Sequence, residues 1–204
     1  MHRFLAVVPA LAAGLFAAGV SAATLTARVV DKTGKPLAGA VVMLEPVGAG
    51  LPVKPMTGIE ISQIRKKFDP DVTVVTVGTA VTFPNRDTVR HHVYSFSSAK
   101  TFELKLYAGT PSTPVVFDKP GIAVIGCNIH DRMTAWVVVV DTPLYARSAA
   151  DGSARLEGVG AGNYRLRAWH PALPADAPPP SIAASVAAAD LEQSIRLDDV
   201  GAAE

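Results

Sequence analysis

The only cysteine of the chain lies in a short cluster of residues that can bind a metal ion. Cys127 is followed three residues later by His130 and three residues after that by Met133. A thiolate, an imidazole and a thioether are three of the four ligands of a blue copper site, which needs two His, one Cys and a weak axial Met. The remaining imidazole has to come from elsewhere in the chain, and the adjacent His91 and His92 are the obvious source.

Each of these residues also has an ordinary structural interpretation. Free cysteine is among the most buried residue types, and Met commonly fills gaps in apolar cores. His130 could be a turn residue and His91 a surface residue. The metal hypothesis is preferred because it explains residue types, order and spacing together.

The first residues predict export from the cytoplasm. A short basic start at residues 1–3 is followed by an apolar run to Val20 and then by small residues. This arrangement is typical of a cleaved secretory signal peptide, which we place at residues 1–22. A membrane anchor is the alternative, but the run has the minimum length of a span and is broken by Pro9. We therefore expect a periplasmic protein without stable membrane insertion.

The charge of the chain argues against two classes of partner. It has 19 Lys and Arg residues against 18 Asp and Glu residues. A net charge near zero gives no reason to expect binding to nucleic acid or to an anionic membrane surface. In an oxidising compartment an unpaired thiol is at risk of oxidation, and burial or metal ligation of Cys127 would protect it.

Short strand signals separated by Gly, Pro, Asn and Asp dominate the chain. They fall at residues 24–30, 40–44, 72–77, 81–83, 102–107, 115–117, 122–125, 135–140, 153–156, 163–168, 181–186 and 193–197. Many short strands with frequent turns predict an all-β chain of the β-sandwich class. Thr57 and Glu60 have the spacing of a helix capping box, but the alternation of Ile59 and Ile61 favours a strand there.

Three other features receive plain interpretations. Residues 65–67, Arg-Lys-Lys, are most simply a solvated turn, with a docking patch for an acidic redox partner as the alternative. Trp136 is expected in the core of the middle of the chain. His170 follows a predicted strand and is expected to cap or pack locally without binding a metal.

Two turn motifs that lie far apart resemble the halves of one domain. Residues 31–40 read D-K-T-G-K-P-L-A-G-A, and residues 151–166 read D-G-S-A-R-L-E-G-V-G-A-G-N-Y-R-L. They resemble the carboxypeptidase regulatory-like (transthyretin-like) sandwich, whose halves are close in sequence. The resemblance implies a discontinuous, Ig-like β-sandwich of residues 24–57 and 143–199. A second domain, residues 58–142, would then be inserted in one of its loops.

The middle segment resembles the cupredoxins, a family of Greek-key β-sandwiches that includes amicyanin and plastocyanin. The resemblance rests on the pattern F-x-N-x-D at residues 83–87, on a histidine shortly before Val93, and on the Cys-His-Met loop that precedes the strand at 135–140. The two-residue gaps of that loop are those of amicyanin. The resemblance implies one type-1 copper ion as cofactor.

The same resemblance assigns roles to individual residues. It implies copper ligation by His91, Cys127, His130 and Met133, listed here in chain order. His92 then occupies the place usually held by Asn or Ser. Adjacent side chains of an extended segment point to opposite faces, so only one of the two histidines should bind the metal.

Supporting roles follow from the same pattern. Asn85 and Asp87 belong to the F-x-N-x-D motif, and with His92 they are expected to lie around the ligands rather than to bind the metal.

The loop that carries Cys127 departs from the usual pattern in two places. Asp131 beside the ligand histidine makes the rim more polar, and Gly126 replaces a bulkier residue before Cys127, which could expose the sulfur. Parts of residues 121–145 also look like proteins labelled as methylamine-utilisation proteins.

These observations predict a periplasmic electron carrier with no enzymatic turnover. It would carry single electrons between redox proteins, such as a c-type cytochrome or a dehydrogenase, because four protein ligands leave no open position for a substrate. One alternative is a copper-binding module, chaperone or enzyme with an open axial site. Another is a metal-free adhesion or scaffold module built from two β-sandwiches.

Overall fold

The computed structural model describes residues 22–130, 132–174 and 177–200 as an all-β chain. The predicted fold class is therefore confirmed, and among these residues there is no α-helix. Residues 1–21 of the predicted signal peptide lie outside the described part. None of the described residues forms a helix that could cross a membrane.

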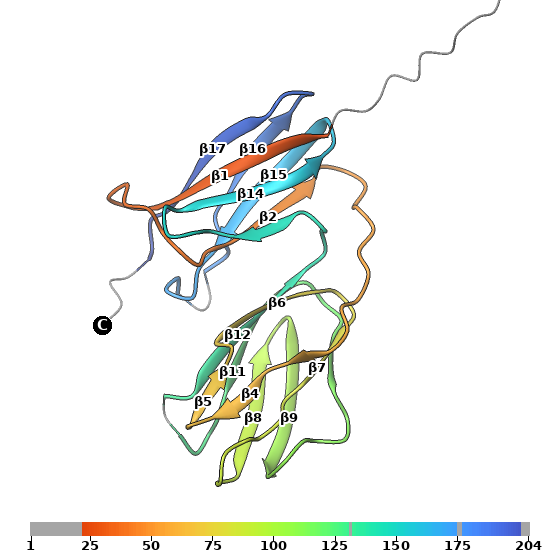
Figure 1. Ribbon diagram of the computed structural model, residues 1–204, viewed down its shortest axis with the longest axis vertical. Helices are drawn as coiled ribbons and strands as arrows, with labels where there is room; N and C mark the ends of the chain where they lie inside the picture. The colour runs from red at the N-terminus through yellow and green to blue at the C-terminus, as the bar shows by residue number, and fades with distance from the viewer. Residues whose placement is uncertain (1–21, 131, 175–176, 201–204) are drawn as a thin grey trace, which may run out of the picture.

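The strands, shown in Figure 1, are β1 (Ala23–Asp31), β2 (Val41–Pro46), β3 (Ile59–Glu60), β4 (Ser62–Ile64), β5 (Lys67–Asp69), β6 (Val72–Thr76), β7 (Thr79–Thr82), β8 (His91–Ser97), β9 (Lys100–Tyr107), β10 (Val115–Phe117), β11 (Gly121–Gly126), β12 (Thr134–Val140), β13 (Tyr145–Arg147), β14 (Ser153–Val159), β15 (Gly162–Trp169), β16 (Ser181–Val186) and β17 (Leu191–Leu197).

The two ends of the chain together form one pair of sheets. One sheet has the order β14-β1-β17 and the other has the order β13-β2-β15-β16. β1 shows why this segment forms a strand, because Leu25, Ala27 and Val29 are fully buried while the residues between them are more exposed. β1 pairs antiparallel with β14 and parallel with β17, so the first and last strands of the chain lie side by side.

The middle of the chain forms the other sheets. The largest has the order β6-β12-β11-β8-β9, and a smaller one has the order β10-β7-β3. β4 and β5 form a short hairpin. A separate core cluster lies among these strands, with Ile61, Phe83, Phe117 and Ile125 among its buried side chains. Among the strands of the described residues, none from the middle pairs in a sheet with one from the two ends. The boundaries given above for the two domains, and the carboxypeptidase-like identity of one of them, stay predictions.

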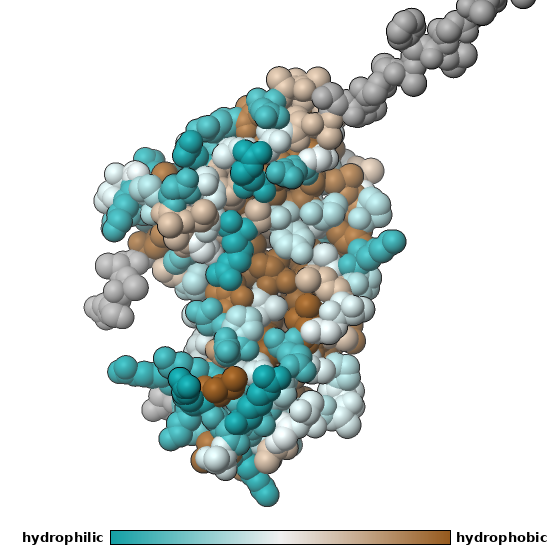
Figure 2. All heavy atoms as spheres, in the orientation of Figure 1, coloured by the Kyte–Doolittle hydropathy of each residue, from teal (hydrophilic) through white to brown (hydrophobic). Residues whose placement is uncertain are grey.

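The two halves of the molecule pack against each other through an apolar contact. Val72 and Val138 of the middle sheet belong to the core cluster of the other half. Trp136 packs against the same cluster, with its ring centroid 6.2 Å from that of Trp169. Figure 2 shows hydrophobic side chains gathered in this region between the halves. The prediction that Trp136 lies in the core of the middle segment was wrong, because β12 turns Trp136 away from that core and Val137 towards it.

Residues 57–68 form strands rather than a helix, as favoured from the sequence. β4 and β5 are joined by a tight turn in which Arg65 and Lys66 both have left-handed backbones, with φ of 53° and 57°. Non-glycine residues in this conformation need support from their surroundings. That support comes from Asp87, which belongs to the candidate site.

Candidate metal centre

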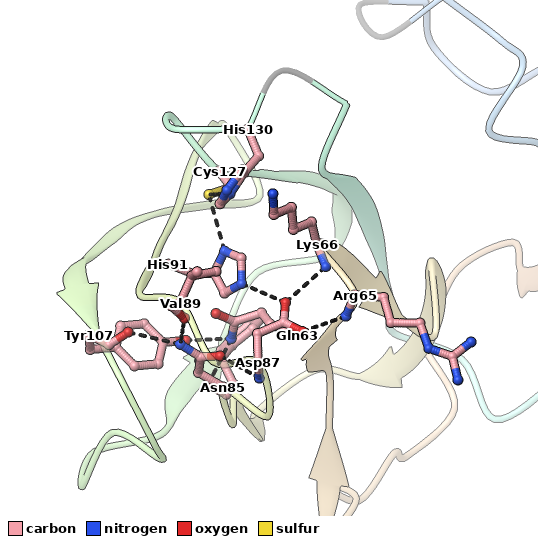
Figure 3. Close-up of polar contacts among 11 residues, drawn as sticks. Gln63, Arg65, Lys66, Asn85, Asp87, Val89, His91, Tyr107, Cys127 and His130 are labelled. Atoms are coloured by element: carbon pink, nitrogen blue, oxygen red, sulfur yellow. Dashed lines mark hydrogen bonds and ion pairs between the residues drawn. The ribbon is translucent and has the colours of Figure 1, made fainter.

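Three of the predicted ligands meet at one end of the sheets that the middle of the chain forms. His91 is the first residue of β8, Cys127 directly follows β11, and His130 lies in the loop before β12. One donor atom from each lies within 4.8 Å of the other two. Figure 3 shows the three side chains converging there.

The donor atoms are close enough for one ion to touch them together. Cys127 Sγ lies 3.8 Å from His91 Nδ1 and 3.7 Å from His130 Nδ1. An ion about 2.3 Å from sulfur and about 2.0 Å from an imidazole nitrogen can bridge donors up to about 4.3 Å apart. His91 is fully buried and Cys127 is 6% exposed, whereas His130 is only half-buried. The site therefore lies inside the protein and reaches the surface through His130.

Backbone hydrogen bonds of the loop bring Cys127 and His130 together. The Met133 N–H donates to the His130 carbonyl over 3.0 Å, and the Cys127 N–H donates to the Met133 carbonyl over 3.2 Å. These bonds close the loop at the point where the pairing of β11 with β12 ends. The Met133 side chain is 2% exposed and belongs to the same core cluster as Cys127. Its role as the fourth ligand stays a prediction.

Asp87 fixes the orientation of His91. The Asp87 Oδ2 atom lies 2.8 Å from His91 Nε2. If Nε2 carries the hydrogen, the lone pair of Nδ1 faces Cys127 and can bind a metal. A carboxylate behind a ligand histidine is a common way to fix both ring orientation and tautomer.

The same carboxylate holds the β4–β5 turn. Asp87 accepts hydrogen bonds from the Arg65 N–H over 2.5 Å and from the Lys66 N–H over 2.8 Å. Burial alone would raise the pKa of Asp87, but the bonds from Lys66, His91 and Arg65 outweigh it and hold that pKa below its ordinary value. Asp87 is therefore an anion that supports the strained turn and the histidine at once.

Asn85 organises the loop that carries Asp87. Its Nδ2 donates to the carbonyls of Val89 and Tyr107, and its Oδ1 accepts from the Asp87 N–H over 2.9 Å. The Asn85 backbone N–H donates to the Gly109 carbonyl. A single buried amide thus ties the 85–91 loop to the end of β9, as Figure 3 shows for the labelled residues.

His92 points away from this cluster. Its Nε2 lies 2.9 Å from a Glu103 carboxylate oxygen on β9, without the alignment that a hydrogen bond requires. The alternation of β8 explains the difference, because His91, Val93 and Ser95 face inward and His92 and Tyr94 do not. The structure thus brings His91 to Cys127 and leaves His92 on the outer face of the sheet.

The ring of Tyr94 fills the space beside Gly126. A Cβ atom at Gly126 would lie 2.9 Å from the Tyr94 ring and 3.0 Å from its hydroxyl oxygen. Tyr94 and Gly126 are register partners across β8 and β11. The expectation that a small residue here could expose the sulfur was wrong, since Cys127 remains buried. Asp131, the other departure, lies outside the described residues.

The sequence analysis did not identify Gln63 and Tyr107, two hydrogen-bonded residues near the candidate site. Gln63 is fully buried, and its Nε2 donates to the Phe83 carbonyl and to the Tyr107 hydroxyl. The Tyr107 hydroxyl also donates to the Phe83 carbonyl over 2.6 Å. The pKa of Tyr107 is raised to about 12, chiefly by burial and also by negative charge at the nearby Cys127 sulfur, while the bond from Gln63 lowers it. No sequence pattern marks these residues, since their partners are 20 to 44 positions away.

Comparison with known proteins finds similarity only among solved structures. No family model and no curated protein matches the chain. A purple cupredoxin from Nitrosopumilus maritimus matches 41% of this chain and 100% of its own, with 22% identity and a TM-score of 0.37. A reduced Cu(I) form of an amicyanin variant matches 43% of this chain and 86% of its own, with 21% identity and a TM-score of 0.38. A copper-containing nitrite reductase from Thermus scotoductus SA-01 matches 55% of this chain and 28% of its own, with 23% identity and a TM-score of 0.39.

Proposed function

We propose that this protein binds one copper ion through His91, Cys127 and His130, with Met133 as the fourth ligand, and carries single electrons. The observation that supports the proposal best is the convergence of three donor atoms within 4.8 Å. The Asp87 carboxylate contacts the other ring nitrogen of one donor residue, His91. A thiolate with two imidazoles suits both Cu(I) and Cu(II), because thiolate favours the reduced ion and imidazole also suits the oxidised ion. Bound copper would supply the one-electron couple.

The chain's own residues would limit rearrangement during that change of charge. His91 is held from behind by Asp87, and the loop from Cys127 to Met133 is closed by two backbone hydrogen bonds. Ligands that are fixed before the electron arrives need to move little when it does. The half-buried His130 offers a short route between the buried thiolate and a partner at the surface.

Burial also favours a carrier over an enzyme. His91, Cys127 and Met133 are nearly inaccessible to solvent, so a substrate would have no approach through them. Four protein ligands would fill the coordination sphere, whereas catalytic metal sites keep a position open. We place this activity in the periplasm, with a c-type cytochrome or a dehydrogenase as redox partner. A role in methylamine utilisation is part of the same proposal, and its only support is the resemblance within residues 121–145.

The visible spectrum of the copper-loaded protein tests the function. One equivalent of Cu(II) should give an intense thiolate-to-copper band, a narrow copper hyperfine splitting and a reversible one-electron wave. Cys127→Ser should abolish the band, while Ser153→Ala, far from the site, should leave it unchanged. A pale spectrum of a tetragonal site would point instead to an open-site copper protein. Rapid loss of Cu(I) to a competing chelator would point to a chaperone. Absence of stoichiometric copper binding would favour a metal-free module.

A further inference from the structure

The loops that build the metal centre carry an excess of positive charge. The 65–66 turn, the 85–91 loop and the 127–133 loop contain five basic residues and two acidic ones. These are Arg65, Lys66, Arg86, Arg90 and Arg132 against Asp87 and Asp131. The whole chain has a net charge of only +1, so positive charge is concentrated at this end.

Most of this charge is exposed and is not neutralised nearby. Lys66, Arg90 and Arg132 are exposed, and none of them forms an ion pair with another described residue. Arg86 is the exception, because its guanidinium lies 2.8 Å from a Glu60 carboxylate oxygen. The carboxylate of Asp87 is already engaged by His91 and by the turn.

A hydrogen bond places Lys66 beside the ligands, and position in the chain places Arg90 and Arg132 next to them. The Lys66 N–H and the His91 ring bind the same oxygen of Asp87, each over 2.8 Å. Arg90 directly precedes His91, and Arg132 lies between His130 and Met133. In Figure 3 the Lys66 side chain extends towards the end of the sandwich where His130 lies. Three exposed cations from three separate segments therefore lie on or beside the loops that carry His91 and His130.

Exposed apolar side chains lie on the same loops as these basic residues. Ile129, next to His130, is 49% exposed, and Val89, two residues before His91, is 41% exposed. An apolar centre with a charged rim is the usual composition of a protein–protein interface. A membrane surface would need no such centre, since lysine and arginine alone suffice to bind anionic lipids.

We infer that the rim of Lys66, Arg90 and Arg132 is the docking surface for a redox protein whose own cofactor lies in an acidic face. This inference rests on the proposed function and specifies the partner chemistry. Complementary charge would orient the partner so that its cofactor faces His130, and it would raise the association rate at low ionic strength. The exposed apolar side chains would then exclude water from the contact.

Two cytochromes that differ mainly in surface charge provide the probe. Native cytochrome c is basic, and its succinylated form is acidic with the same haem. The full chain loaded with copper is mixed with each cytochrome, and the second-order electron-transfer rate is measured by stopped flow at low and high salt. The test variant is Lys66→Glu/Arg90→Glu/Arg132→Glu. The control is Lys32→Glu/Lys35→Glu/Lys119→Glu, which makes the same charge change at exposed positions outside the site loops.

The electron-transfer rate with the succinylated cytochrome should fall at least about 10-fold in the test variant. In the control it should fall less than about 2-fold. The difference should largely vanish at high ionic strength, because salt screens exposed charges. Equal losses in both variants would overturn the proposal. So would an unchanged rate accompanied by lost binding to vesicles of phosphatidylcholine and phosphatidylglycerol, which would assign the rim to a membrane.

A second measurement separates this proposal from the proposed function. Complex formation between the metal-free protein and each cytochrome is measured by isothermal titration calorimetry. Binding to the succinylated form that is lost in the test variant supports the docking surface, even if no electron is transferred. Binding that is equal for both cytochromes overturns it, even if the copper centre is confirmed.

Discussion

Asp87 Oδ2 lies 2.8 Å from His91 Nε2 and accepts a second hydrogen bond from the backbone of Lys66. One carboxylate therefore connects a left-handed turn on one hairpin with a histidine at the start of another strand. The turn needs an acceptor for its N–H groups, and the histidine needs a fixed orientation. The position of His91 thus depends on Lys66 and Arg65, which are 25 and 26 places earlier in the chain.

Replacing Asp87 by Asn should weaken copper binding by about 10- to 100-fold. Asn keeps an acceptor for one N–H of the turn, but it lacks the negative charge that holds the His91 ring. Affinity is measured by competition with a chromophoric Cu(I) chelator, and the unfolding of the metal-free variant is followed in parallel. Asp118→Asn, at an exposed residue bound to Lys100, is the control. Equal copper affinity in Asp87→Asn and in the parent would show that the carboxylate does not support the ligand.

Substitution of Gly126 by Ala should destabilise the protein by about 1–3 kcal/mol, because the added methyl group would overlap the Tyr94 ring. Urea unfolding of the metal-free protein measures the loss. Tyr94→Ser creates space for the methyl group, so the loss caused by Gly126→Ala should be smaller in that background. Gly50→Ala, where nothing lies within 4 Å of the new Cβ, is the matched control. Identical losses with and without the Tyr94 ring would contradict the close contact.

The all-β class could be predicted because short β-rich runs, such as the one that forms β1, are separated by turn residues along the chain. β8 was missed because polar and apolar residues are mixed on both of its faces. His91 and Ser95 are fully buried on its inner face, while Phe96 on the outer face is 77% exposed. Hydrophobicity therefore gives no strand signal in this segment. β13 was also missed, because its three residues include no Val or Ile, unlike the equally short β10.

Part of the candidate site could be predicted from local spacing, and the resemblance to the cupredoxins added His91. Cys127, His130 and Met133 lie on one loop, so their spacing carries the signal directly. The contact of Asp87 with the 65–66 turn and the burial of Gln63 depend on strand pairing between distant segments. Such pairing cannot be read from a single sequence. For the same reason the sequence did not show which core Trp136 packs against, and Trp136 was assigned to the wrong one.

The contact between Trp136 and Trp169 should couple the two halves of the molecule. Aromatic pairs contribute about 0.5–1.5 kcal/mol beyond the area they bury. A double-mutant cycle of Trp136→Leu and Trp169→Leu should give a coupling free energy in that range, measured by urea unfolding. Phe83→Leu lies in the other core cluster, so its cycle with Trp169→Leu should be additive within about 0.5 kcal/mol. Additivity of the two Trp substitutions would mean that the halves do not stabilise each other through these rings.

His170 should make the stability of the metal-free protein depend on pH below about 6.5. Its Nδ1 accepts a hydrogen bond from the Ala172 N–H over 3.1 Å, which requires the unprotonated form. Burial lowers the pKa of His170 from 6.5, the nearby Arg147 lowers it further, and a bond to the Ala38 backbone opposes both. Because the folded-state pKa lies below the unfolded one, the unfolded chain takes up the proton first as the pH falls. The contribution of His170 is therefore complete above pH 6.5 and is lost as the pH falls towards its folded-state pKa.

The free energy of unfolding, measured in urea at a series of pH values, should accordingly decline on this acid side. His170→Gln should reduce the decline, because an amide does not titrate. Lys35→Gln, at an exposed residue of the β1–β2 connection, should leave the slope unchanged. The copper-loaded protein is unsuitable for this measurement, since protonation of the ligand histidines would add its own pH dependence. A slope that is the same in His170→Gln and in the parent would assign the decline to other groups.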